Sequence, residues 1–578
     1  MGVGFACSNS RILLYSFQMP NKNASKQLKE FYKRHKKGLL ILVTVLLFFL
    51  IFIISVLGGL RIFIPHFHEL TGFPFGQKNY LVVFQNNNEL RPSGGFISSF
   101  ATISFTAGIP TEIKIEDVYG NIDNHEYISP PYPMEELLAN EWYQGYSFRD
   151  ANFYANFPET AEELIKMYQI TRPEKEFDGV IAINFSVLEN LVEKIGPISV
   201  NGITLTKDNL FEKITESVND VDRHSIEDLE NRKSILKPLA FSLLQKIMFN
   251  PFLIRNTSDV ITASLNQKEI QLYFKKPSLQ KLAEDRNWGG TWPDQSEGDF
   301  LAIVDANLGG MKSNRYINKN INYHVTFTEE NLSDKTSPNA ELNIKAEHYG
   351  IENIPMSGPY TGYLRFYKSP SEKNPRDLKI SLNPGETITT TESFLLSPDL
   401  VSEGEYKLTI PKQSGVDNDF FTIIVELPRG WQTASSDFET KENFAIYRGI
   451  PQKDLELKLQ ILPDQNPPRL VKQSNNQINK FSLHFNEDLN QSFAKDPLNY
   501  QIIDLNINHP EITDQIVINE IETTTKDIHI HTSGQTDQNE EHYGILIKGQ
   551  RDNKGNIFED RQVTTVQRLN RYPQNSEV

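Results

Sequence analysis

Three basic residues lie in predicted loops or at strand ends, beside glycines or a carboxylate, where they could bind an anion. They are Arg91, Arg149 and Lys312. Guanidinium and ammonium donors suit phosphate or pyrophosphate, and glycines let a backbone approach a ligand closely. We therefore predict a phosphate-binding group made of Arg91, Arg149, Lys312, Gly94, Gly95, Asn152 and Asn307.

Three aspartates at predicted strand ends could add a divalent cation such as Mg²⁺ to this group. They are Asp117, Asp150 and Asp305. Carboxylate oxygens are the ligands that hard cations prefer, although aspartates at strand ends also commonly form caps and turns. The basic residues have a structural interpretation too, in which each pairs with a nearby carboxylate, as Arg149 could with Asp150 or Glu89, and orders the loops.

The segments that must position these residues have the patterns of a sheet covered by helices. Short apolar runs predict strands at 80–84, 96–105, 111–118, 177–184 and 198–203. Pro158 suits the first turn of a helix that continues to Tyr168. Ser186 and Glu189 have the spacing of a capping box at the start of another helix. The order strand, helix, strand predicts an α/β sheet, and such sheets bind ligands at one rim.

The spacing of apolar residues changes along the chain, from the period of a helix to the strict alternation of a strand. Residues 208–285 read mainly as helix, and a buried strand follows at 300–305. Alternating strands then occur at 321–328, 343–348, 362–367, 405–410 and 421–427, and after the linker at Pro467-Pro468 they recur at 480–485, 499–504 and 543–548. The predicted fold class is a mixed α/β sheet with flanking helices, followed by all-β sandwich domains. The expected divisions are 72–320, 321–465 and 466–570, with a tail at 571–578.

An uncharged apolar run over residues 38–60 is long enough to cross a bilayer as a helix, for which about 20 residues are needed. Many lysines precede it, whereas Arg61 alone follows closely. The positive-inside rule then places residues 1–37 in the cytoplasm and everything after Phe63 outside, with a transmembrane helix at 38–63. A cleaved signal peptide is the alternative, but the run is long and lacks a small-residue cleavage pattern.

The amino-acid composition limits the classes of protein to which the chain can belong. The chain has 578 residues, of which 38% are hydrophobic and 11% aromatic, so several packed domains are expected. Its net charge is −16 and no basic footprint follows the N-terminal tail, which excludes a nucleic-acid binder. The single cysteine, Cys7, precedes the predicted span, so the exported part has no disulfide. If Met19 is the true start, Cys7 is absent.

Signatures of common enzymes are missing from the sequence. There is no Gly-x-Ser-x-Gly elbow, His-Glu-x-x-His motif, Walker loop or dinucleotide fingerprint. His529 and His531 share one face of a predicted strand, but two imidazoles without a third ligand are more typical of a solvated surface. No reaction can be assigned from motifs alone.

Residues 85–96 resemble the signature of the DUF4012 family of bacterial envelope proteins, whose activity is undetermined. The segments 149–152, 178–182 and 305–314 follow in the order of that family, which extends the resemblance over about 72–320. Residues 363–367 and 406–415 are similar to the β-rich part that follows the family's core. The segments 485–487, 499–500 and 552–556 resemble bacterial Ig-like domains. The resemblance implies a protein of the bacterial cell membrane.

The core also resembles the LytR-CpsA-Psr family, through the first strand with Arg91 and through 178–180 leading to Gly196-Pro197. That resemblance implies transfer of glycopolymers from a polyprenyl-pyrophosphate carrier, with arginines on the pyrophosphate and aspartates on Mg²⁺. However, Gly94-Gly95 stand where that family has Asp-Thr, and its Pro-Arg-Asp motif is absent.

Two functions are therefore open. One is a noncatalytic envelope protein that binds surface polymers or an anionic envelope ligand. The other is a glycopolymer transferase acting on a polyprenyl-pyrophosphate-linked substrate. An apolar groove beside Arg91 would favour the transferase, whereas a separate buried ion pair for each basic residue would remove its physical basis.

Overall fold

The structure is a computed structural model that describes residues 58–565, apart from short gaps. These gaps are 120, 124, 139–144, 220–235, 249, 294–297, 310, 334, 353–356, 429–430, 442, 464–466, 478–479, 505–510, 513–515, 534–542, 549, 553–555, 557 and 559–562. The predicted cytoplasmic tail, the tail at 571–578 and all of the predicted span except 58–63 lie outside the described residues. Among the described helices, none is both long and apolar enough to cross a bilayer.

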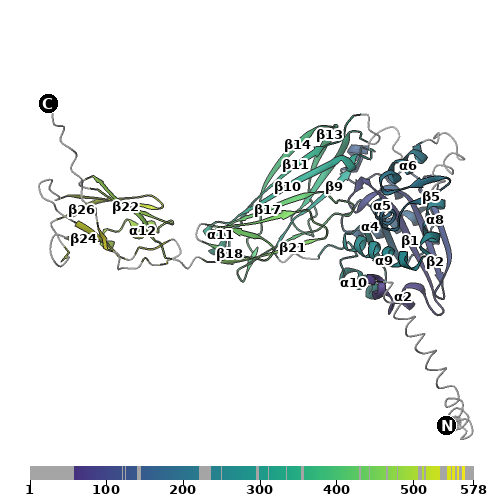
Figure 1. Ribbon diagram of the computed structural model, residues 1–578, viewed down its shortest axis with the longest axis horizontal. Coiled ribbons are helices and arrows are strands. Elements are labelled where there is room, and N and C mark those ends of the chain that lie inside the picture. Colours follow the sequence, from purple (N-terminus) through teal and green to yellow (C-terminus); the bar gives the residue numbers. More distant parts are fainter. Residues whose placement is uncertain are drawn as a thin grey trace, which may run out of the picture.

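The first part of the chain, residues 58–292, forms an α/β module around one mixed sheet (Figure 1). Its strand order is β3-β2-β1-β4-β7, with β1 antiparallel to β2 and parallel to β4. The strands are β1 (Gln77–Arg91), β2 (Gly94–Thr106), β3 (Ile109–Asp117), β4 (Gly179–Asn184) and β7 (Ile270–Phe274). The mixed sheet confirms the α/β prediction, but β7 lies in a region that we expected to be helical. Its five residues, Ile-Gln-Leu-Tyr-Phe, are rich in β-branched and aromatic side chains, and they pair with β4 along their whole length.

Helices cover both faces of this sheet because side chains alternate along β1. Leu81 and Val83 pack with α4 (Phe157–Thr171) on one face. Tyr80 packs on the other face with α5 (Phe185–Ile195), α9 (Pro251–Asn266) and α10 (Pro277–Glu284). Further α-helices among the described residues of the module are α2 (Phe67–Thr71), α3 (Met134–Leu138), α6 (Lys207–Asn219) and α8 (Leu236–Met248).

Two local predictions in this module were wrong. The segment 198–203 is not a strand of the main sheet, because β5 (Ile198–Val200) pairs with β6 (Ile203–Leu205) in a small hairpin. Its turn, Asn201-Gly202, has φ angles of 50° and 83°, as the Asn-Gly turn of a hairpin requires. Ser186 and Glu189 do not form a capping box. Ser186 Oγ donates to Glu269 instead, and Glu189 pairs with Arg315.

Residues 299–462 form a β-rich module around one apolar core. Its largest sheet has the order β14-β11-β10-β17-β20-β19, and smaller sheets, β13-β12-β9 and β15-β16-β21-β18 with β8, face the same core. The strands are β8 (Asp299–Phe300), β9 (Ala302–Asn307), β10 (Ile317–Thr326), β11 (Asn339–His348), β12 (Tyr360–Tyr367), β13 (Arg376–Leu382), β14 (Thr387–Leu395), β15 (Val401–Ser402), β16 (Glu405–Ile410), β17 (Phe420–Glu426), β18 (Gln432–Ala434), β19 (Glu439–Lys441), β20 (Phe444–Gly449) and β21 (Leu455–Leu462), and the short helix α11 (Glu329–Ser333) follows β10.

One strand that we assigned to the α/β core belongs elsewhere. The buried run at 300–305 begins at the end of β8 and continues into β9, which pairs with β12 of the β-rich module and not with the first sheet. Its side chains still contribute to both modules, because Ala306 and Leu308 pack into the core of the α/β module whereas Leu301 and Ile303 pack into the β-rich core. The two modules are therefore joined by shared packing.

The last described part, residues 470–565, has two four-stranded sheets around a third core. One sheet contains β22 (Leu470–Gln477), β23 (Lys480–Phe485), β27 (Asp527–Ser533) and β26 (Val517–Thr523), the other contains β25 (Glu511–Ile512), β24 (Tyr500–Asp504), β28 (Tyr543–Ile547) and β29 (Val563–Thr565), and α12 (Gln491–Ala494) is a short helix. His529 contacts Ser482 and His531 pairs with Glu522. The domain boundaries at 320 and 465 stay predictions.

Candidate functional site

The turn between β1 and β2 leaves no space for a ligand beside its glycines. A Cβ atom at Gly94 would collide with the Gln85 side chain, and one at Gly95 would collide with the backbone of Asn86. Gly94 also has a φ of 142°, which side chains rarely adopt. Glycine at both positions is thus required by the packing of the hairpin on itself, and no ligand contact is needed to explain it.

Arg91 ends β1 and is buried, with 2% of its surface exposed. Its guanidinium donates to the backbone carbonyls of Asn307 and Leu90 and pairs with Glu89 at 3.2 Å. A second carboxylate, that of Asp150, lies 3.5 Å from the same Nη2 atom. The guanidinium charge is therefore neutralised inside the protein, where a salt bridge depends on such close partners.

Arg149 lies on the other side of Asp150. Its Nε is 3.4 Å from Asp150 Oδ2, and its Nη1 donates to Asp123 Oδ2 at 3.0 Å. Asp150 therefore bridges two arginines. We call Glu89, Arg91, Asp123, Arg149 and Asp150 the arginine cluster. The pairing of Arg149 with Asp150 is one of the ion pairs that we considered from the sequence.

Lys312 is the third predicted cation, and its charge acts on the same cluster. Burial raises the pKa of Glu89, and the positive charges of Arg91 and Lys312 offset only part of that rise. The three predicted cations thus act on the same small set of protein carboxylates. The cluster therefore already contains its own anions.

We expect the arginine cluster to make stability depend on pH through Asp123. Burial raises the pKa of Asp123 from 3.8 to about 6, and the charge of Arg149 offsets only part of the rise. Between these values the folded state binds more protons than the unfolded state. The free energy of unfolding should therefore fall as pH rises from 4 to 7, by about 2 kcal/mol from this group.

Denaturant unfolding at pH 4, 5, 6 and 7 measures this effect. Asp123→Asn should remove its part of the pH slope, whereas the exposed Asp285→Asn should leave the slope unchanged. Identical slopes in the wild type and Asp123→Asn would show that the carboxyl titrates alike in both states.

The two predicted asparagines hold backbone segments together. Asn152 is fully buried and donates to the carbonyl of Gly95 at 2.7 Å. Asn307 is also fully buried, and its side-chain amide donates to Met311 O and to Asn314 Oδ1. These contacts position the turns on both sides of Arg91, so the NH₂ groups of both amides already have internal acceptors, although Asn152 Oδ1 is buried without a hydrogen-bond donor among the described residues.

The predicted magnesium ligands have separate partners. Asp117 accepts from the backbone N–H of Tyr119, as in an Asx turn. Asp150 lies in the arginine cluster, and Asp305 pairs with Lys319 at 2.7 Å and accepts from the Tyr360 hydroxyl. In the part of the chain that the structure describes, no group of three or more His, Cys, Asp or Glu residues is arranged to hold a metal ion.

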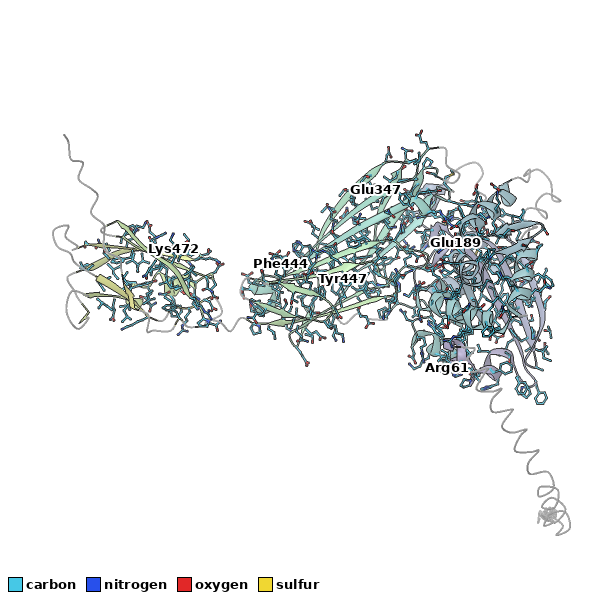
Figure 2. All side chains as sticks on the ribbon, in the orientation of Figure 1. Arg61, Glu189, Glu347, Phe444, Tyr447 and Lys472 are labelled. Atoms are coloured by element: carbon cyan, nitrogen blue, oxygen red, sulfur yellow. The ribbon has the colours of Figure 1, made fainter. Side chains whose placement is uncertain are left out.

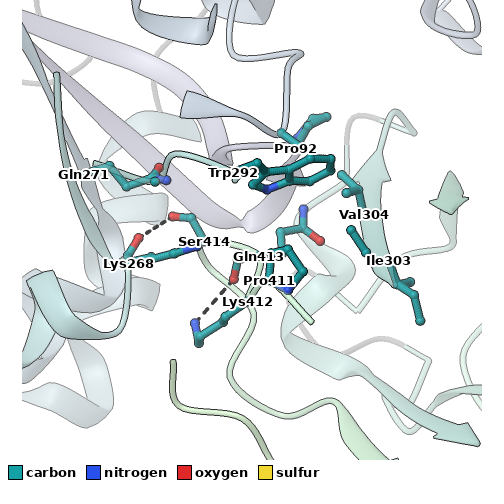
Figure 3. Close-up of a pocket in the computed structure, with 13 residues that line it drawn as sticks. Pro92, Lys268, Gln271, Trp292, Ile303, Val304, Pro411, Lys412, Gln413 and Ser414 are labelled. Atoms are coloured by element: carbon teal, nitrogen blue, oxygen red, sulfur yellow. Dashed lines mark hydrogen bonds between the residues drawn. The ribbon is translucent and has the colours of Figure 1, made fainter. Parts of the chain in front are cut away.

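A loop of the β-rich module docks against the β1–β2 turn. We call residues 411–419, between β16 and β17, the docking loop. Its Gln413 amide donates to the carbonyls of Arg91 and Asp305, at 3.1 and 2.7 Å, and accepts from Asp305 N. Its Ser414 donates to the carbonyl of Lys268 at 2.6 Å. Figure 3 shows Gln413 next to Trp292, and Ser414 joined to Lys268 by this hydrogen bond.

A second buried ion pair lies under this loop. Lys412 Nζ is 3.3 Å from Glu269 Oε1, and neither side chain exposes more than 3% of its surface. Glu269 also accepts hydrogen bonds from Ser186 and from Asn184. Burial opposes the charge of Glu269, but Lys412 and these hydrogen bonds outweigh it and hold its pKa below the ordinary value.

The space around the docking loop is small. One cavity of about 10 Å³ lies between Pro92, Trp292 and Gln413, and another of about 30 Å³ lies between Val416, Asp419 and neighbouring residues. A water molecule needs about 10–15 Å³ measured in this way, so these cavities hold no more than about two waters.

Sequence reasoning missed Glu269, Lys412 and Gln413. They lie far from the β1–β2 turn along the chain, in a turn before β7 and in a loop after β16. Polar residues in loops carry no signal of a buried partner. The one hint was that residues 406–415 resemble the part that follows the DUF4012 core.

The fold and this buried network define an α/β module joined tightly to a β-rich module. A family model described as "Protein of unknown function (DUF4012)" matches residues 76–218, about a quarter of the chain. This match confirms the DUF4012 resemblance over those residues; its extension to residue 320 and the Ig-like resemblance stay predictions. No curated protein matches the sequence.

Solved structures match at low similarity. Lin1025 from Listeria innocua has 11% identity and a TM-score of 0.21 over 39% of this chain and 85% of that chain. TagV from B. subtilis has 9% identity and a TM-score of 0.21 over the same shares. The N-terminal part of the bacterial S-layer protein SbsC has 16% identity and a TM-score of 0.15, over 18% of this chain and 23% of that chain. Likenesses this weak carry no conclusion, and the LytR-CpsA-Psr resemblance stays a prediction.

Proposed function

We propose that the chain is a single-pass protein of the bacterial cell envelope whose exported modules bind surface polymers and catalyse no reaction. The observation that carries this proposal is the neutralisation of the arginine cluster. Arg91 and Arg149, which would have to hold an anionic ligand, are buried or nearly so and contact protein carboxylates at 3.0 to 3.5 Å. A pyrophosphate would have to displace these partners.

The anchored, exported location is supported by the uncharged run at 38–60 and its basic cytoplasmic flank. The β-rich module extends away from the α/β module (Figure 1), which suits a protein that presents binding surfaces at a distance from its anchor. Surface polymers are therefore the ligands that we propose, in preference to an anionic ligand at Arg91.

The alternative is a transferase acting on a polyprenyl-pyrophosphate-linked substrate, with Mg²⁺. Pockets that bind small molecules usually enclose about 300–1,000 Å³. The cavity beside the β1–β2 turn has about 10 Å³, and the one at the docking loop has about 30 Å³. This difference counts against a carrier-lipid groove beside Arg91.

Thermal unfolding with and without a short-chain polyprenyl pyrophosphate and Mg²⁺ distinguishes the two functions. A ligand at about a hundred times its dissociation constant would stabilise the protein by about 2.7 kcal/mol. We expect no such shift, and we expect Arg91→Ala to be less stable in either condition. A shift in the wild type that disappears in Arg91→Ala would favour the transferase.

The proposed topology predicts opposite labelling of two cysteines in intact cells. Cys7, in the cytoplasmic tail, should not react with a membrane-impermeant maleimide. A cysteine in place of the exposed Asn374 of the β-rich module, in a Cys7→Ser background, should react. Permeabilised cells provide the control, in which both should be labelled. Labelling of Cys7 before permeabilisation would show that the N-terminal tail lies outside the cell, and the proposed topology would be wrong.

A further inference from the structure

Five exposed apolar side chains gather next to the C-terminal end of the predicted membrane span. They are Ile64, Phe67, Phe73, Phe75 and Ile109, and we call them the apolar patch. Phe75 exposes 93% of its surface and Ile109 exposes 65%. The rings of Phe67 and Phe73 lie 6.0 Å apart. A soluble surface rarely leaves neighbouring aromatic residues exposed in this way unless they contact a partner.

Backbone hydrogen bonds hold the patch together from two parts of the chain. Gly108, in the turn between β2 and β3, donates to the carbonyl of Thr71, and Ala107 donates to the carbonyl of Gly76. Gly108 also lies against Phe73, where a Cβ would come within 3.1 Å of the ring. These contacts place Ile109 beside the segment 67–75. The patch is therefore preformed on the folded module.

The predicted span enters the α/β module without a linker. The 3₁₀ helix η1 (Gly58–Phe63) takes up the last residues of the predicted helix at 38–63, so these residues belong to the folded module and the predicted span is too long at its C-terminal end. In η1, Leu60, Ile62 and Phe63 pack against the core of the module, and the Phe63 ring lies 5.7 Å from that of Trp288. The surface around η1 must then stay close to the bilayer.

The distance between the span and the patch is short. Phe67 follows Phe63 by four residues, which cannot reach farther than about 14 Å even when fully extended. Figure 1 shows α2 at one edge of the module beside α10, and Figure 2 labels Arg61 at the same edge. The patch and the membrane exit thus share one face.

We infer that the apolar patch inserts into the outer surface of the bilayer and holds the α/β module against it. This inference rests on the proposed function, because it requires the anchor. Aromatic side chains are enriched at the level of the lipid headgroups. Polar groups border the patch: Glu69 pairs with Lys276 at 2.6 Å, and His68 is exposed. They can remain among the headgroups while the rings enter the apolar layer.

Quenching by spin-labelled lipids tests the inference on the full chain in phosphatidylethanolamine–phosphatidylglycerol vesicles. In a Cys7→Ser background, a fluorophore on Phe75→Cys should be quenched by lipids labelled near the headgroup. The same fluorophore on Asn374→Cys, in the β-rich module, should not be quenched. Adding Phe67→Ser and Ile109→Ser should remove most of the quenching at position 75, whereas Ile351→Ser, which replaces an exposed residue elsewhere, should not change it.

Two controls separate failure of the inference from failure of the anchor. Extraction of the vesicles with alkaline carbonate should leave the protein bound; its release would overturn the proposed function together with the inference. If the protein stays bound but position 75 is not quenched, the inference alone is wrong. Crosslinking between two copies at position 75, in place of quenching, would mean that a second copy covers the patch and would also overturn it.

Discussion

Arg91→Ala should lower the free energy of unfolding of the α/β module by about 3–5 kcal/mol, because it leaves buried carboxylates without their cation. Glu89 and Asp150 each contact the Arg91 guanidinium, and both are buried. The variant also removes the hydrogen bond to the carbonyl of Asn307, which links β1 to β9. Denaturant unfolding gives the loss, and hydrogen exchange of β1 and β2 shows where it arises.

Two comparisons make this expectation specific to the buried charges. Arg286→Ala removes an exposed arginine of the same module and should change stability by less than about 0.5 kcal/mol. Combining Arg91→Met with Glu89→Gln and Asp150→Asn should recover part of the loss, since neutral groups need no counter-charge. If Arg91→Ala were as stable as Arg286→Ala, Arg91 would be free for a ligand and the proposed function would lose its main support.

The sequence predicted elements of the α/β module well where the pattern was local. The apolar run at 80–84, the helix after Pro158 and the run before Asn184 all became the predicted element types. Pairing was harder. The buried run at 300–305 was recognised as a strand, but its partner β12 lies more than 50 residues further along the chain. A local period identifies a strand and does not identify the strand beside it.

The candidate site shows the same limit. Residue types and chain order led us to group Arg91, Arg149 and Lys312, because all three follow strands or precede carboxylates. Whether they meet a ligand or a protein carboxylate depends on distances that the sequence does not contain. The pairing of Arg149 with Asp150 was among the predicted alternatives and is present at 3.4 Å. Nothing local indicated that Gln413 would reach the carbonyl of Arg91.

The second large effect that we expect concerns the joint between the modules. Lys412→Met should destabilise the protein by about 3–5 kcal/mol, because Glu269 would keep its buried charge without its counter-ion. The hydrogen bonds from Ser186 and Asn184 to Glu269 would remain, but they do not replace a positive charge. The docking loop should then detach more often, since Lys412 lies within it.

Hydrogen exchange tests this local consequence. Residues 411–419 and the β1–β2 turn should exchange faster in Lys412→Met, whereas strands remote from the joint, such as β11 and β14, should not change. Lys453→Met replaces an exposed lysine of the same module and serves as the matched control. Adding Glu269→Gln to Lys412→Met should restore part of the stability, because the remaining buried group is then neutral. If Lys412→Met and Lys453→Met unfold alike, the ion pair does not hold the modules together, and the joint must depend on the apolar packing of Ala306 and Leu308 and on the Gln413 hydrogen bonds.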